Sequence, residues 1–168
     1  MKSFATRAAF IAFSAVASAE AQHAPKSGAE PAYLEVEKVE LRLSSMGPAV
    51  LLRVGNRAIP VIVDGTVAES IHGALTGRKP VRPLSHDLMH DILSSLDAKV
   101  TRVIVTLHDG IFHGAMTVVT RERSRVFDSR SSDAIALAIH FKAPILVRQE
   151  LLDSVGIEVE ESGAAGKR

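Results

Sequence analysis

An apolar helix is the sequence feature that most limits how this chain can fold. In the segment DSRSSDAIALAIHFKAPI, at 128–145, Ser131 or Ser132 is placed to cap a helix that continues to about His140. Pro144 prevents the helix from continuing. Because the helix is apolar almost all round, we expect it to be buried, and small residues allow it to approach a sheet closely: Ala134, Ala136 and Ala138.

Runs of aliphatic and β-branched residues separated by turn signals predict the strands. Asp109 and Gly110 lie between two such runs and indicate a β-hairpin. We expect three sequential antiparallel strands, the first with one slip or bulge, and then a later group around the hairpin: 33–43, 49–54, 59–63, 101–107, 111–120, 125–128 and 145–147. Helices are expected at 64–74, 85–96, 133–140 and 150–155. This order predicts an α+β fold: a single compact domain with a mixed, mostly antiparallel sheet and three to four helices packed on it.

The first 19 residues have the pattern of a secretory signal peptide. Lys2 and Arg7 precede a short apolar run at 8–16, and Ala-Ser-Ala at 17–19 forms a cleavage site of small residues. The run is too short to span a bilayer. We therefore expect cleavage after residue 19, with residue 21 as the alternative, and a periplasmic or secreted protein that has no membrane contact in its mature form. An amphipathic N-terminus that is not cleaved is the other interpretation.

The rest of the chain divides into three parts. Residues 20–32 contain two prolines and a glycine without apolar periodicity, which predicts a disordered leader. The folded domain is expected at 33–159, and the polar residues 160–168 are expected to form a mobile tail.

Composition limits how such a domain could bind nucleic acid. Removal of Lys2 and Arg7 from the 20 basic residues leaves 18 against 19 acidic residues, so the mature domain is near neutral, whereas nucleic-acid binders usually have a basic surface. Aromatic residues make up 4% of the chain and Trp is absent, which argues against a base-stacking platform. The chain has no Cys, which excludes disulfides and thiolate chemistry.

The helix predicted from Ser85 places polar side chains at the border of an apolar stripe. We expect this stripe to face the core: Leu88, Met89, Ile92, Leu93 and Leu96. His86 lies in the first turn, near free N–H groups that can hold a phosphate, and its imidazole suits acid–base chemistry. The alternative is a capping network in which Asp87 accepts from backbone donors and His86 only packs.

Two further interpretations concern His90 and Asp133. His86 and His90 have the spacing of a zinc-protease HExxH helix, with Asp in place of Glu, but no third ligand has supporting spacing, so His90 is interpreted as a boundary histidine. Asp133 opens the buried helix beside Arg130, and His140 falls on nearly the same side. A carboxylate there needs a partner, so Asp133 either caps the helix and pairs with Arg130 or has a metal-binding or catalytic role.

Basic residues gather at two places where they could steer a phosphate backbone, although clustered surface arginines are more often only solvated. The first cluster precedes the helix from Ser85, and the second lies near a strand turn: Arg78, Lys79 and Arg82, then Arg121, Arg123 and Arg125.

The motifs RPLSHDL at 82–88 and SDAIALA at 132–138, with the Asp-Gly turn between them, resemble those of the bifunctional nuclease family. The resemblance covers about 33–157. It implies a compact α+β domain, cleavage of DNA and RNA as substrates, and self-association as a homo-oligomer, with a dimer favoured.

Residue type then suggests roles within that family. We expect His86 to act as acid or base, and Asp87 and Asp133 to orient water or bind a divalent metal ion of unknown identity. Arg130 would stabilise phosphate charge, and the basic cluster would bind substrate: Arg82, Lys79 and Arg78.

Three positions depart from the family pattern. Val67 stands where a Glu is expected, with Glu69 two residues on, Ser131 stands where Pro is usual, and His113 stands where Tyr is common. The loss of that Glu matters if it binds metal. The leading hypothesis is an exported nuclease with little sequence preference. The alternative, which the neutral charge and scarce aromatics favour, is a non-enzymatic self-associating domain that binds a partner protein or a small ligand.

Overall fold

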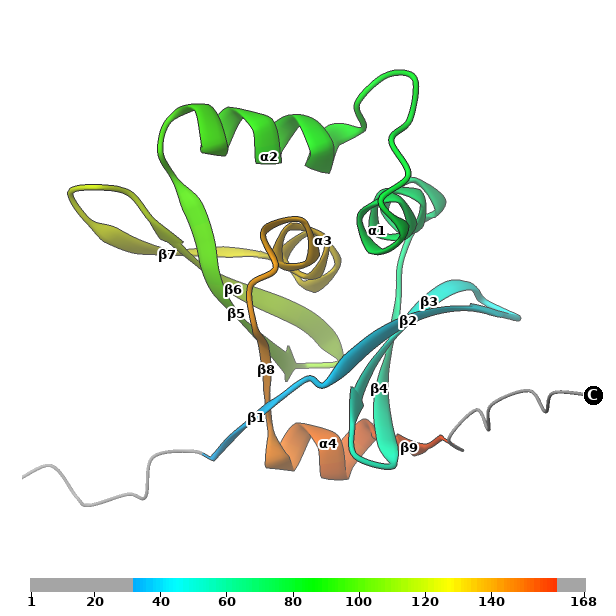
Figure 1. Cartoon of the computed structure of the whole chain (residues 1–168). Helices are drawn as coiled ribbons and strands as arrows, with labels where there is room; N and C mark the ends of the chain where they lie inside the picture. The colour runs from blue at the N-terminus through cyan, green and yellow to red at the C-terminus, as the bar shows by residue number, and fades with distance from the viewer. Residues whose placement is uncertain (1–31, 160–168) are drawn as a thin grey trace, which may run out of the picture.

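The computed structural model describes residues 32–159. The predicted signal peptide at 1–19, the predicted leader apart from Ala32, and the predicted tail at 160–168 lie outside these residues. Within 32–159 the chain forms a single α+β domain, as predicted, and its strands divide into two sheets (Figure 1). The sequence pattern does not indicate this division.

The larger sheet carries most of the predicted later strands. Its order is β1 (Tyr33–Glu35), β8 (Ile145–Arg148), β5 (Lys99–His108), β6 (Ile111–Val119) and β7 (Ser124–Arg130). Neighbouring strands are antiparallel except for β5 and β8, which are parallel. The predicted hairpin is confirmed: Asp109 and Gly110 connect β5 to β6, with φ values of 51° and 77°.

The smaller sheet contains β2 (Lys38–Ser44), β3 (Gly47–Val54), β4 (Arg57–Ile62) and β9 (Ile157–Glu158) in that order. The three sequential antiparallel strands are confirmed as β2 to β4. The expectation of one strand at 33–43 is wrong, because Glu35 pairs with Leu146 of β8 whereas Lys38 pairs with Arg53 of β3. The predicted slip is the point where the chain crosses from one sheet to the other.

Four helices lie within residues 32–159: α1 (Gly65–Thr76), α2 (Ser85–Ser95), α3 (Ser131–Phe141) and α4 (Gln149–Val155). Helices α1, α2 and α3 lie together on one side of the sheets, and α4 lies beside β4 at the other end (Figure 1). None of the helices in this part of the chain has the length and apolar content needed to cross a membrane.

The serines predicted to cap α2 and α3 lie inside the first turns of these helices, because each cap position falls earlier in the chain than predicted. Helix α1 begins after Asp64, whose carboxylate accepts a hydrogen bond from the Val67 N–H at 2.9 Å. Ser85 is the first residue of α2 rather than its cap, because the N-cap position falls on Leu84, whose N–H donates to Asp87. Likewise, Ser131 and Ser132 are buried residues of the first turn of α3, and neither caps it, since the cap position falls on Arg130.

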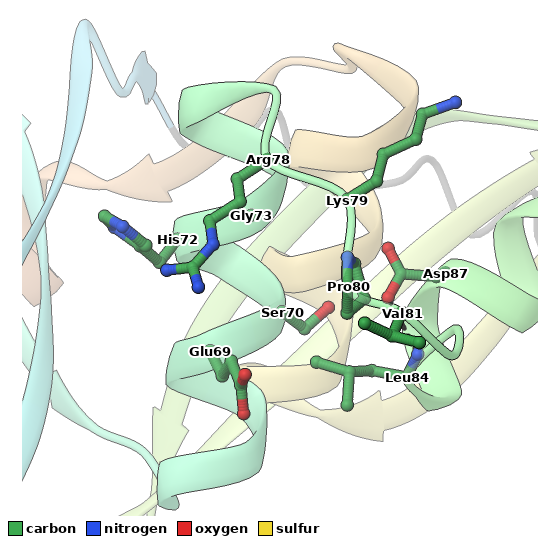
Figure 2. Close-up of a pocket in the computed structure, with 10 residues that line it drawn as sticks. All are labelled: Glu69, Ser70, His72, Gly73, Arg78, Lys79, Pro80, Val81, Leu84 and Asp87. Atoms are coloured by element: carbon green, nitrogen blue, oxygen red, sulfur yellow. Dashed lines mark hydrogen bonds between the residues drawn. The ribbon is translucent and has the colours of Figure 1, made fainter.

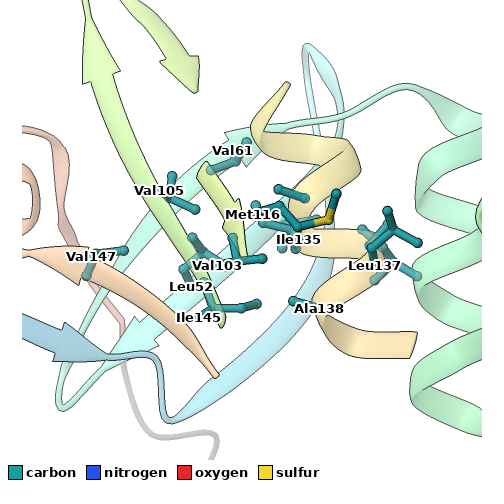
Figure 3. Packing of buried hydrophobic residues seen from close by; sticks show 14 of the residues in the cluster. Leu52, Val61, Val103, Val105, Met116, Ile135, Leu137, Ala138, Ile145 and Val147 are labelled. Atoms are coloured by element: carbon teal, nitrogen blue, oxygen red, sulfur yellow. The ribbon is translucent and has the colours of Figure 1, made fainter. Parts of the chain in front are cut away.

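The predicted burial of α3 is confirmed. The helix packs on the larger sheet and against α1 and α2, and its apolar residues join those of both sheets in one core (Figure 3). Gly114 of β6 lies directly beneath the start of α3: a Cβ at Gly114 would be 2.5 Å from the Cβ of Ala134. The helix therefore approaches the sheet more closely than any residue with a side chain at Gly114 would allow.

The predicted packing of α2 is wrong for most of its apolar stripe. Only Leu93 packs against the core, while the other four side chains are exposed: Leu88 by 51%, Met89 by 41%, Ile92 by 48% and Leu96 by 67%. Helix α2 faces α3 with His86, which is buried, so the helix turns a polar border inward and much of its apolar stripe outward. The periodicity identified the stripe correctly but contained no information about what covers it.

Substitution Gly114→Ala is expected to lower the free energy of unfolding by about 1–3 kcal/mol, because the added methyl group overpacks the contact between β6 and α3. The matched control is Gly65→Ala, where a Cβ meets no atom within 4 Å, so its stability should stay within about 1 kcal/mol of the wild type. Urea unfolding measures both values. Equal stability of the two variants would contradict the close approach.

Candidate active site

The predicted site residues of α2 and α3 form two reciprocal contacts between the helices. His86 of α2 places its Nε2 atom 3.1 Å from Oδ1 of Asp133 on α3. The next residue, Asp87, places its Oδ1 atom 3.8 Å from Nε2 of His140 on α3. Two consecutive residues of α2, His86 and Asp87, therefore contact two residues of α3 that lie two turns apart, Asp133 and His140.

The first contact belongs to a network at the start of α3. Arg130 donates to both carboxylate oxygens of Asp133, from Nε at 2.9 Å and from Nη2 at 3.1 Å. The same guanidinium lies 3.9 Å from the carboxylate of Asp64, just before α1. This Asp133 network ties together the first turns of α2 and α3 and the start of α1. The predicted ion pair of Asp133 with Arg130 is present.

The electrostatics of the Asp133 network favour the ionised carboxylate. Burial raises the pKa of Asp133, but the hydrogen bonds from Arg130 and His86 outweigh it, so the pKa lies below its usual value. The hydrogen bond to Asp133 raises the pKa of Arg130. The side chain of His86 is only 8% exposed, whereas that of Arg130 is 69% exposed. Because His86 also lines neither of the two cavities found beside α2, it is poorly placed to touch a substrate.

The second contact lies at a cavity of about 360 Å³, which we call the Asp87 cavity. Its charged and titratable lining comes from the loop after α1, from α2 and from α3: Arg78, Lys79, Asp87, His90, Asp91 and His140. A smaller hollow adjoins it and shares Asp87 with it. Figure 2 shows the carboxylate of Asp87 facing the loop at Pro80, while Lys79 extends from that loop and Arg78 runs along α1 toward His72.

His140 also lines this cavity, although no catalytic or binding role was predicted for it from the sequence. Its Nε2 atom is 3.0 Å from the hydroxyl of Ser70, a buried residue of α1. Burial lowers the pKa of His140; Asp87 opposes that effect, and the nearby His90 and His86 add to it. The seven-residue spacing from Asp133 was the available signal, because it places both side chains on one side of α3.

The three basic residues predicted to bind substrate do not all lie at the Asp87 cavity. Arg78 and Lys79 line the Asp87 cavity, whereas Arg82 is exposed outside its lining. None of the ion pairs found within residues 32–159 involves these three side chains. Their charges are thus not neutralised by a carboxylate in the described part of the chain, which leaves them available to an anion.

The geometry does not assemble a metal site from these residues. Across residues 32–159, no three His, Asp or Glu side chains are arranged to hold a metal ion. His86 and His90, which have the HExxH spacing, contact different partners: His86 contacts Asp133, and the ring of His90 lies 4.5 Å from that of Phe141. Val67, at the position where a family Glu was expected, is buried in the core.

These observations define a small α+β domain with a polar cavity between its helices, and comparison with known proteins identifies its family. Residues 50–160 match the bifunctional nuclease domain. An uncharacterized protein of Mycobacterium tuberculosis is 31% identical over 117 residues, which cover 68% of this chain and 70% of the relative. The chain belongs to the bifunctional nuclease domain family, which confirms the resemblance of its SHDL and SDAIALA motifs.

Two relatives from Arabidopsis thaliana are longer proteins. Bifunctional nuclease 2 is 27% identical over 148 residues, which cover 86% of this chain and 43% of the relative. Bifunctional nuclease 1 is 28% identical over 123 residues, which cover 69% of this chain and 38% of the relative. The matched region therefore spans less than half of either plant protein.

Substitution Asp133→Asn is expected to destabilise the fold at pH 7 by about 1–3 kcal/mol, because it removes an ionised acceptor from Arg130 and from buried His86. Since the pKa of Asp133 is lowered in the folded protein, its contribution is complete above the unfolded value of about 3.9 and is lost as the pH falls through the folded value. The difference from the wild type should therefore shrink below about pH 4 in urea unfolding curves.

The control for this series is Asp128→Asn, because the side chain of Asp128 is 86% exposed and lies 3.9 Å from its partner, His113. This variant should unfold like the wild type. A wild-type stability difference for Asp133→Asn that stays constant from pH 7 to pH 2 would contradict the pairing.

Proposed function

We propose that this chain is an exported nuclease that hydrolyses phosphodiester bonds of DNA and RNA with little sequence preference. The observation that carries the proposal is the Asp87 cavity, whose lining combines cations that have no carboxylate partner within residues 32–159 with carboxylates and imidazoles from three segments. Membership of the bifunctional nuclease domain family supports the reaction class. The signal-like pattern at 1–19 supports export to the periplasm or the medium.

Different cavity residues would bind the phosphate and orient the attacking water. Lys79 and Arg78 attract and hold the phosphate, since their charges have no carboxylate partner within residues 32–159. Asp87 orients the attacking water, because it lines the cavity beside the basic loop. Recognition of the phosphate rather than of the bases accounts for the lack of sequence preference, and it agrees with the scarcity of aromatic side chains.

The Asp133 network has a positioning role in this proposal. His86 precedes Asp87 in the first turn of α2, and its hydrogen bond to Asp133 fixes that turn against α3. The sequence suggested that His86 and Asp133 react directly with substrate, but neither residue lines the Asp87 cavity, which favours support of Asp87 instead. Arg130 would neutralise Asp133 rather than the substrate phosphate.

A divalent metal ion was expected from the residue types, and it remains a proposal. The side chains within residues 32–159 do not form a ligand set for one, so no step of the proposed reaction is assigned to a metal. Inclusion of EDTA in the cleavage assay tests whether one is required.

Substitution Asp87→Asn is expected to reduce kcat for plasmid and RNA cleavage by about 100-fold or more, because the amide cannot orient water as an ionised carboxylate does. The fold should persist, since an amide oxygen can still accept from the Leu84 N–H. Lys79→Ala should raise KM about 5- to 10-fold and reduce its dependence on salt, with a smaller change in kcat.

Two exposed residues away from the cavity provide matched controls: Asp128→Asn for the carboxylate and Lys99→Ala for the cation. Both should cleave like the wild type. Full cleavage by Asp87→Asn would place the reaction elsewhere, and absence of cleavage by the wild type, with and without EDTA, would reject the nuclease proposal.

The exposed stripe of α2 favours a second property, self-association. Leu88, Met89, Ile92 and Leu96 form an apolar surface along one helix, and such surfaces commonly mark interaction sites. We propose that a second copy of the chain covers this stripe in a homodimer, in which α2 packs against α2. As a non-enzymatic alternative, the same stripe would serve a self-associating domain that binds a partner protein or a small ligand.

Substitution Ile92→Glu is expected to convert the dimer to a monomer in sedimentation velocity, because it places a charge at the centre of the stripe. Its control is Val126→Glu, an exposed apolar residue of β7 outside the stripe, which should leave the dimer intact. A wild-type protein that sediments as a monomer at every concentration tested would contradict the proposed interface.

A further inference from the structure

We propose that His140 is the residue that removes a proton from the attacking water in the Asp87 cavity. The inference rests on the proposed nuclease function and adds to it a catalytic residue from the last turn of α3.

Three helices fix the position of the His140 imidazole. The ring comes from α3, Ser70 of α1 lies 3.0 Å from its Nε2 atom, and Asp87 of α2 lies 3.8 Å from the same atom. The side chain is 9% exposed, and this residue lines the Asp87 cavity together with Lys79. A base whose Nε2 atom is held by neighbours from two helices, in a residue that lines a cavity together with cations, meets the geometric requirement for proton transfer.

His86 is a weaker candidate for the same role. The residue does not line the Asp87 cavity, and its Nε2 atom belongs to the Asp133 network. His90 lines the cavity, but its side chain is more exposed, its Nδ1 atom lies 3.2 Å from Asp91, and its ring lies tilted 4.5 Å from that of Phe141 on α3. Of the three histidines, His140 is the one that combines burial, a cavity wall and a facing carboxylate.

The groups around His140 favour the neutral imidazole near pH 7. Those that face it are Ser70 from α1 and, from α2, two carboxylates and two histidines: Asp87, Asp91, His86 and His90. Burial is the largest influence and lowers the pKa of His140 below its usual value, while Asp87 opposes this and keeps the protonated form attainable. A base must be neutral before it accepts a proton, so this environment suits the role.

The reaction balances with water as the only co-reactant. The imidazole takes one proton from water as the water oxygen forms a bond to phosphorus. The ester P–O bond breaks, and its electron pair stays with the leaving oxygen, which takes up a proton from a second water. The hydroxide that remains accepts the proton of the imidazolium. The products are a phosphomonoester and a free hydroxyl group, and His140 is neutral again.

The first test compares the pH dependence of kcat for plasmid cleavage by the full-length protein and by His140→Gln. The wild type should lose activity as the pH falls through the pKa of His140, below about 6.5. His140→Gln should lose about 100-fold in kcat, with less than a threefold change in KM, and should lose this acid limb. The matched control is His108→Gln, an exposed histidine of β5, which should retain both the rate and the limb.

A second variant keeps the proposal testable if His140→Gln does not fold. Protonated His90 lowers the pKa of His140, so His90→Gln should move the acid limb to higher pH. An NMR titration of the assigned His140 ring in the wild type should give a pKa equal to the midpoint of the limb. A purely structural histidine would produce neither result.

The outcomes distinguish the proposed role of His140 from the proposed nuclease function. Loss of the limb in His140→Gln, or a limb that follows the NMR pKa of His140 in both the wild type and His90→Gln, supports the assignment. A folded His140→Gln with wild-type rate and limb, or a limb midpoint unrelated to the His140 pKa, overturns it and leaves the nuclease proposal standing. A wild type that cleaves nothing at any pH overturns both.

Discussion

The burial of α3 is the constraint on which the rest of this structure depends. The helix is apolar from Ala134 to Ala138, and it lies where the two sheets meet α1 and α2. Its polar side chains, Asp133 and His140, flank this apolar stretch and enter the interior with it. Because a polar group that leaves water must regain its hydrogen bonds, each of them requires a partner from a neighbouring element.

Helix α2 supplies these partners with two consecutive residues. His86 turns to Asp133 and Asp87 turns to His140, so the packing of the two helices and the arrangement of the site are the same set of contacts. The close approach of α3 to Gly114 fixes the height of the helix above the sheet. A change in that approach would move both contacts together, and it would alter the Asp87 cavity without touching its lining.

Much of the fold was predictable from the sequence, because local signals determine it. The hairpin at Asp109 and Gly110 and the burial of α3 follow from turn chemistry and periodicity. The crossing of the chain between two sheets at Val36 was not predictable, since alternation continues through it and only strand pairing distant in sequence reveals the break. The outward orientation of the α2 stripe was also missed, because it depends on how α2 packs against elements that are distant in sequence.

The candidate site was predicted in part. The two motifs contain His86, Asp87 and Asp133, and Arg130 lies just before the second motif; the structure brings all four together where α2 and α3 meet. The sequence could not show that these residues separate into a buried network and a cavity wall. That separation depends on the relative positions of three helices, as does the placement of His140, whose partners lie 70 and 53 residues away in the chain.

The most direct test of this account is a crystal structure of the protein with a short phosphorothioate oligonucleotide bound. The account predicts a phosphate in the Asp87 cavity, within hydrogen-bonding distance of Lys79 and facing Asp87 and His140, with the Asp133 network unchanged. A strand bound on another surface, with this cavity untouched, would contradict it.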